Sequence, residues 1–76
     1  MKLYNIPRNS RIKAETYEDG KKLGDFIIFH RLDGLFSFCT VEGSGEVCHL
    51  WACTQLIERD GYYEIAVDKP LAEGEE

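Results

Sequence analysis

The stretch that decides the fold is residues 24–57, GDFIIFHRLDGLFSFCTVEGSGEVCHLWACTQLI. It contains three apolar runs separated by two tight-turn sequences, Asp33-Gly34 and Gly43-Ser44-Gly45. Asp-Gly is a strong hairpin signal, because glycine readily adopts the positive φ that two-residue turns require. The stretch therefore predicts three adjacent antiparallel strands at the core of a small β domain. The three runs span residues 26–29, 35–41 and 47–53.

Further strands are predicted on both sides of this stretch. Residues 10–17, SRIKAETY, alternate between polar and less polar side chains, which is typical of a half-buried strand. Asp19-Gly20 predicts a turn, and Gly24 predicts a sharp bend inside the next strand. The fourth strand is expected to kink or break at Thr54-Gln55, and Asp60-Gly61 predicts the last turn. The five predicted strands span residues 10–17, 21–32, 35–41, 47–57 and 62–68.

The predicted fold class is all-β, in one domain formed by residues 1–68. Connections this short join antiparallel neighbours, so we expect a five-stranded meander. Such a sheet can hide its edges by curling into a small barrel. Residues 1–9 contain Pro7 and are expected to form a lead-in strand or edge segment, with a short helix as the alternative. Residues 69–76 are predicted to be an acidic, disordered tail.

The order of turns and strands resembles the Sm/LSm-like small β-barrel, over roughly residues 10–67. In that family a first strand ends in Asp-Gly and a strongly bent second strand with an internal glycine follows, as Asp19-Gly20 and Gly24 do here. The resemblance implies an Sm-like or SH3-like barrel, and it raises RNA binding as an expectation. The family's RNA-binding residues are replaced, however. His30, Asp33 and Gly34 stand where its Asp and Asn are expected, and His49-Leu50-Trp51-Ala52 stands where its Arg-Gly pair is expected.

The charge of the chain bears on its partners. The formal net charge is −5, and an acidic domain does not attract phosphate backbones over long distances. No apolar run approaches the roughly 18 residues of a membrane span. The first residues also lack the continuous apolar segment of a secretory signal. We therefore expect a cytoplasmic protein with no membrane partner.

Basic residues gather near the start of the chain, and they are the candidates for nucleic-acid binding. If the first two strands pair, these side chains would form one basic edge, with a tyrosine available for base stacking. The competing interpretation is a solvated face of mixed charge, because Glu15, Glu18 and Asp19 are interspersed among them. The basic candidates are Arg8, Arg11, Lys13, Lys21 and Lys22.

The cysteines and histidines offer weak support for chemistry. Cys39, Cys48 and Cys53 are odd in number and lack the close spacing of a zinc site or a disulfide framework. A catalytic arrangement of Cys39 with His30 and Asp33 would need a pocket that so small a sheet hardly provides. We predict that the thiols are reduced and partly buried, and that the protein is not an enzyme and binds neither metal nor cofactor. A thiol-dependent or metal-dependent activity is the least favoured alternative.

The middle strands are apolar on both faces, which predicts self-association. A small meander has one interior, so a second apolar face needs cover from another subunit, a ligand or the chain ends. We therefore expect a non-enzymatic interaction module that forms a homo-oligomer. The alternative is an Sm-like RNA-binding ring. If instead Tyr4, Ile6 and the chain ends cover the second face, the protein would be a monomer. The predicted interface residues are Leu35, Cys39, Val41 and Trp51.

Overall fold

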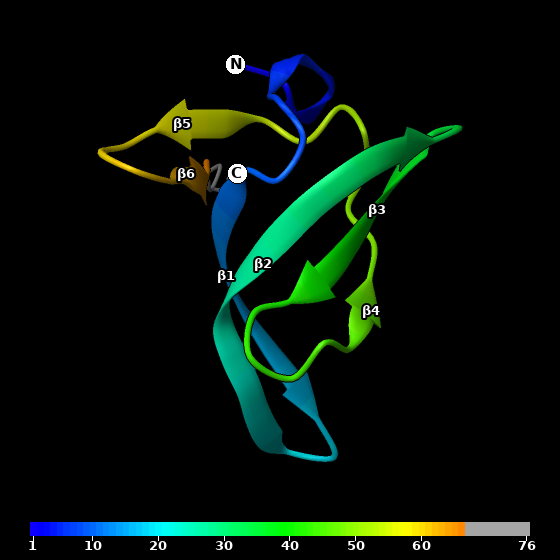
Figure 1. Ribbon diagram of the computed structural model, residues 1–76, viewed down its shortest axis with the longest axis vertical. Coiled ribbons are helices and arrows are strands. Elements are labelled where there is room, and N and C mark those ends of the chain that lie inside the picture. Colours follow the sequence, from blue (N-terminus) through cyan, green and yellow to red (C-terminus); the bar gives the residue numbers. More distant parts are fainter. Residues whose placement is uncertain (67–76) are drawn as a thin grey trace, which may run out of the picture.

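A computed structural model describes residues 1–66 of the chain and contains one mixed sheet (Figure 1). The sheet has six strands in the order β4-β3-β2-β1-β6-β5, so β4 and β5 are its edges. A short 3₁₀ helix, η1, precedes the first strand. The elements are η1 (Leu3–Asn5), β1 (Arg11–Glu18), β2 (Lys21–Asp33), β3 (Phe36–Val41), β4 (Val47–Cys48), β5 (Leu56–Glu58) and β6 (Tyr63–Ile65).

Strands β1 and β2 form a long antiparallel hairpin whose tip projects beyond the rest of the sheet (Figure 1). Asp19 and Gly20 both have positive φ, 53° and 79°, as a two-residue type I′ turn requires. The predicted alternation along β1 is confirmed, because Ile12 is buried in the core whereas Lys13 and Glu15 are exposed. The positive φ values of Asp19 and Gly20 likewise confirm the predicted turn.

Gly24 marks the point where β2 bends over the core. The register of β1 against β2 shifts beside Gly24, and the strand appears as a long curved ribbon in Figure 1. A Cβ atom at this position would lie 2.8 Å from Val41 Cγ1 and 3.2 Å from the Glu42 carbonyl oxygen. Glycine is therefore required here because the chain from β3 approaches too closely for any side chain.

We expect Gly24→Ala to lower the free energy of unfolding by about 1–3 kcal/mol, because the added methyl group pushes against Val41. Urea denaturation measures this loss. The matched control is Gly20→Asn, at a turn position where a Cβ atom would meet nothing within 4 Å and where asparagine tolerates positive φ. Equal losses in the two variants would contradict the close-approach explanation.

Strands β2 and β3 pair across a two-residue turn at Gly34-Leu35, one residue later than the turn predicted at Asp33-Gly34. The alternation of side chains along the two strands defines two faces. On the inner face, the core consists of apolar side chains from both strands, from β1 and β5 and from the N-terminal segment. A register shift between Phe29 and Arg31 lets His30 and Arg31 both lie near the outer face, where each contacts Phe38. The buried apolar residues are Leu3, Ile6, Ile12, Ile27, Phe29, Cys39, Val41 and Leu56.

The predicted fourth strand is interrupted. Only Val47–Cys48 and Leu56–Glu58 are strands, and the chain turns between them at Trp51. The Trp51 carbonyl oxygen accepts hydrogen bonds from both the Thr54 amide, at 3.0 Å, and the Thr54 hydroxyl, at 2.6 Å. Such local bonds from a threonine compete with strand pairing. The predicted break at Thr54-Gln55 is thus confirmed, but the interruption is longer than expected, because it extends over residues 49–55.

This interruption changes the topology from the predicted one. After β4, at one edge of the sheet, the chain crosses to the opposite edge, where β5 and β6 form an antiparallel hairpin. β6 then pairs with β1 in parallel, Ile12 lying opposite Tyr63 and Lys13 opposite Glu64. The prediction of a five-stranded antiparallel meander was therefore wrong in two respects. The sheet has six strands, and β6 pairs with β1 in parallel. Within residues 1–66 the edge strands β4 and β5 do not pair with each other, so the sheet is not closed into a barrel.

The N-terminal segment covers the inner face of the sheet. It forms the 3₁₀ helix η1, the alternative to a lead-in strand, and its backbone bonds to the chain between β4 and β5. The Leu3 amide donates to Thr54 O at 2.9 Å and the Tyr4 amide donates to Ala52 O at 3.1 Å. Leu3 and Ile6 are buried, so this segment completes the core.

The remaining predictions on organisation concern the end of the chain and membranes. The predicted acidic tail, residues 69–76, lies outside the described residues, as do the last two positions of the predicted fifth strand. Among residues 1–66, no helix is both long and apolar enough to span a bilayer.

Candidate functional site

Aromatic rings gather on the outer face of β2, β3 and the segment after β4, and we call them the aromatic face. Phe36 and Trp51 face each other across an isolated bridge, with ring centroids 4.5 Å apart. Phe38 lies between the two histidine rings, 5.5 Å from His30 and 6.3 Å from His49. The aromatic face consists of His30, Phe36, Phe38, His49 and Trp51.

The outer end of this face is strongly exposed. The relative exposure is 55% for Trp51, 42% for Phe36 and 73% for Leu35, which adjoins them at the β2–β3 turn. Large apolar side chains that are exposed singly are ordinary, whereas a contiguous group makes this surface a candidate interaction site. The Leu35 carbonyl oxygen accepts the Ala52 amide at 2.8 Å, which holds the Trp51 segment beside the turn.

Charged groups flank the aromatic face. The Arg31 guanidinium lies over the Phe38 ring, with its Cζ 5.2 Å from the centroid. Asp33 lines a hollow of about 300 Å³ together with Phe36 and His49. His49 Nδ1 donates to the Ser37 carbonyl oxygen at 2.8 Å, because a carbonyl can only accept. The surface thus combines apolar rings with one cation and one carboxylate.

Ser37 is a residue that sequence reasoning missed, and it positions the aromatic face from beneath. It is a fully buried polar side chain on β3. Its Oγ accepts a hydrogen bond from the Leu50 amide at 3.2 Å and donates one to the Leu50 carbonyl oxygen at 3.1 Å. Leu50 lies next to Trp51, so this hydroxyl holds the segment that carries the tryptophan. The alternation along residues 35–41 sets Ser37 on the same face as Cys39 and Val41, so its burial follows once that face forms the core, and a buried hydroxyl needs a partner.

We expect Ser37→Ala to lower the free energy of unfolding by about 1–3 kcal/mol, because the partly buried Leu50 amide loses its acceptor. Denaturant unfolding measures the loss. The control is Ser44→Ala, since Ser44 bonds to the Glu46 amide in an exposed turn and its replacement should cost less than about 0.5 kcal/mol. A loss no larger than that of the control would contradict this role of Ser37.

The predicted interface residues fall into two groups. Leu35 and Trp51 are exposed, whereas Cys39 and Val41 are buried in the core. The prediction placed Trp51 on the same face as Cys39. The register instead sets Cys39 opposite Cys48, so Trp51 aligns with Phe36 on the outer face.

The predicted basic edge is not brought together as expected. β1 lies inside the sheet between β2 and β6, so its first half is not an edge. Arg11 makes two hydrogen bonds to the Glu42 carboxylate, at 3.0 and 2.8 Å, and lies over the Phe26 ring. Lys22 pairs with Asp25, and this hydrogen bond raises the pKa of Lys22.

The other basic candidates are dispersed. Arg8 Nε donates to the His30 carbonyl oxygen at 3.0 Å. Lys13 lies opposite Glu64 in the pairing of β1 with β6, and Lys21 lies at the hairpin tip. These positions favour the solvated face of mixed charge over a continuous basic track.

The thiols and histidines do not converge on one site. Cys39 lies on the inner face, whereas His30 Nε2 bonds to Thr40 Oγ1 at 2.8 Å on the outer face. The arrangement of Cys39 with His30 and Asp33 is therefore not assembled. Among the described residues no group of three or more His, Cys, Asp or Glu side chains lies close enough together to hold a metal ion.

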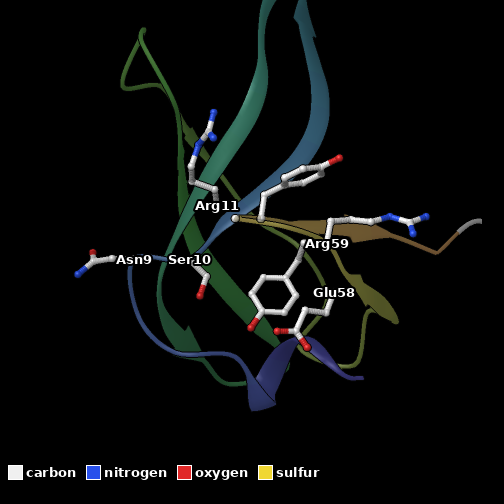
Figure 2. A pocket seen from close by; sticks show the side chains of 8 residues that line it. Asn9, Ser10, Arg11, Glu58 and Arg59 are labelled. Atoms are coloured by element: carbon white, nitrogen blue, oxygen red, sulfur yellow. The ribbon is translucent and has the colours of Figure 1, made fainter.

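A separate cleft of about 330 Å³ lies between the start of β1 and the β5–β6 hairpin (Figure 2). Its two arginines do not converge, because Arg11 is held by Glu42 and Arg59 by Glu64. Figure 2 shows their side chains extending in different directions. The two arginines of the cleft therefore do not point toward one common position.

The described residues thus define a small all-β sheet domain that carries an exposed aromatic surface. Comparisons of the chain with protein-family models, with curated proteins and with solved structures find no match. The geometry of the sheet itself is therefore the basis for inferring a function.

Proposed function

We propose that the protein is a non-enzymatic interaction module that self-associates through the aromatic face. The observation that carries the proposal is the contact between Phe36 and Trp51, two rings that touch each other while both remain exposed. Aromatic residues at the centre of a surface are typical anchors of protein interfaces, because they bury a large area with few rotatable bonds.

A second copy of the chain is the partner that suits this surface. A two-fold interface brings the same patch of both subunits together, so it favours a patch with charges of both signs. Arg31 and Asp33 flank the aromatic rings on one strand, and neither makes an ion pair with another described residue. In a two-fold pairing, Arg31 of one copy would face Asp33 of the other.

The Sm-like or SH3-like relationship is part of the same proposal. It is supported by the bent strand β2 with its internal glycine and by the consecutive antiparallel pairing of β1, β2, β3 and β4. The parallel pairing of β6 with β1 departs from a simple meander. Self-association through a sheet surface does not depend on this relationship.

The test is the solution mass, measured by light scattering on a sizing column across a range of protein concentrations. We expect a mass above that of the 8.7 kDa chain that falls on dilution. Addition of moderate salt should leave the assembly intact, because its contacts are mainly apolar. A monomer at every concentration would overturn the proposal.

RNA binding is the alternative, and the same sample tests it. Single-stranded RNA that binds with an affinity falling steeply with salt and weakened by Lys13→Ala would favour the alternative. We expect no such binding at physiological salt, because the net charge is acidic and because Arg11 and Lys22 are paired with carboxylates.

A further inference from the structure

The pairing of β3 with β4 sets two cysteines directly opposite each other. Cys39 and Cys48 are register partners in this antiparallel pair. On either side, the Ser37 amide donates to Leu50 O and the Val41 amide donates to Glu46 O, both at 2.8 Å. Hydrogen-bonded pairs recur every second residue, so Cys39 and Cys48 occupy a hydrogen-bonded position, where Cα atoms lie about 5.5 Å apart.

This position meets the geometric demands of a disulfide. Disulfides join cysteines whose Cα atoms are about 4.4–6.8 Å apart and whose Cβ atoms point to the same side. Direct register partners share one side of a sheet. Both side chains belong to the inner face, since Cys39 is buried and Cys48 packs against the same core cluster. Cys53 is exposed in the turn after Trp51 and has no such partner among the described residues.

We propose that Cys39 and Cys48 form a site of reversible thiol oxidation, at which a small-molecule disulfide converts the two thiols into a cross-strand disulfide. The thiolate of Cys48 attacks the oxidant, forms a mixed disulfide and releases one small thiol. The thiolate of Cys39 then attacks the Cys48 sulfur and expels the second small thiol. The two cysteines lose two electrons and two protons, and the oxidant is reduced to two thiols.

The position of the pair sets the order and the rate of these steps. Cys48 reacts first because it is partly exposed on an edge strand of two residues, whereas Cys39 becomes accessible when β4 opens. Burial raises the pKa of both thiols, and the neighbouring Cys39 further raises that of Cys48. Oxidation is therefore slow at neutral pH and becomes faster as the pH rises.

The experiment treats the full chain with oxidised glutathione at mildly alkaline pH and measures its intact mass without reduction. We expect the loss of two hydrogen atoms and, after digestion, a linked peptide pair that contains Cys39 and Cys48. The oxidised protein should melt at least about 5 °C higher, because the bond restricts the unfolded chain, and dithiothreitol should reverse both changes.

Matched variants distinguish the three thiols. Cys53→Ser should form the same bond, whereas Cys48→Ser should not, and circular dichroism confirms that each variant folds. A second treatment refolds the protein from urea in a glutathione redox buffer, which removes the barrier of access to Cys39. A linkage that involves Cys53, or glutathione adducts without the internal bond in both treatments, would overturn the proposal.

Discussion

Trp51→Lys is expected to make the protein monomeric at concentrations where the unmodified chain associates. The substitution removes an exposed ring that contacts Phe36 and places a charge against Phe36. Truncation of such an interface anchor typically costs about 2–4 kcal/mol of binding, which raises the dissociation constant by about 30-fold to 1,000-fold. Sedimentation equilibrium across concentration measures this change.

The matched control is Ile57→Lys. Ile57 is also an exposed apolar side chain, but it lies on β5, at the opposite edge of the sheet from β4. Its replacement should leave the association unchanged. Trp51 is the single tryptophan, so its fluorescence should also shift to shorter wavelengths as the unmodified protein is concentrated. If the two lysine variants weaken association equally, the aromatic face is not the interface.

Leu3→Ala should produce the largest loss of stability among the substitutions considered. Leu3 is fully buried at the centre of the contact between the N-terminal segment and the sheet. Its replacement leaves a cavity in a small core, and comparable leucine truncations lower the free energy of unfolding by about 2–5 kcal/mol. Thermal and urea unfolding should both record the change.

The neighbouring Tyr4 provides the control, because its side chain is 51% exposed although its amide bonds to Ala52 O. Tyr4→Ala keeps the backbone bond and should cost less than about 1 kcal/mol. Similar losses in the two variants would mean that the segment is held mainly by its backbone. A small loss for Leu3→Ala would contradict the view that residues 1–6 complete the core.

The sequence predicted those features that depend on local chemistry. Asp19-Gly20 forms the expected turn, and the turn expected at Asp33-Gly34 lies one residue later, at Gly34-Leu35. Each turn requires a glycine with positive φ whatever the rest of the chain does. The alternation along β1 and β3 was likewise visible, since strand residues point to opposite faces in turn.

The features that escaped prediction depend on distant partners. The position of the Leu50 backbone over β3 depends on the Ser37 hydroxyl, 13 positions before it, and no local pattern indicates that bond. The placement of Trp51 followed from the β3–β4 register, which the loop of residues 42–46 determines. The parallel pairing of β6 with β1 has no turn signal at all, because the two strands lie about 50 positions apart.

The contact between the start of the chain and β5 has a consequence for how the protein is made. The Met1 amino group donates to the Leu56 carbonyl oxygen across a separation of 55 residues, and β6 joins β1 over a similar span. Such nonlocal contacts slow folding, because a long loop must close before they form. A chain still emerging from the ribosome cannot complete this sheet until β6 is released. Until then the apolar side chains of the β1–β2 hairpin remain exposed, and chaperones can bind them.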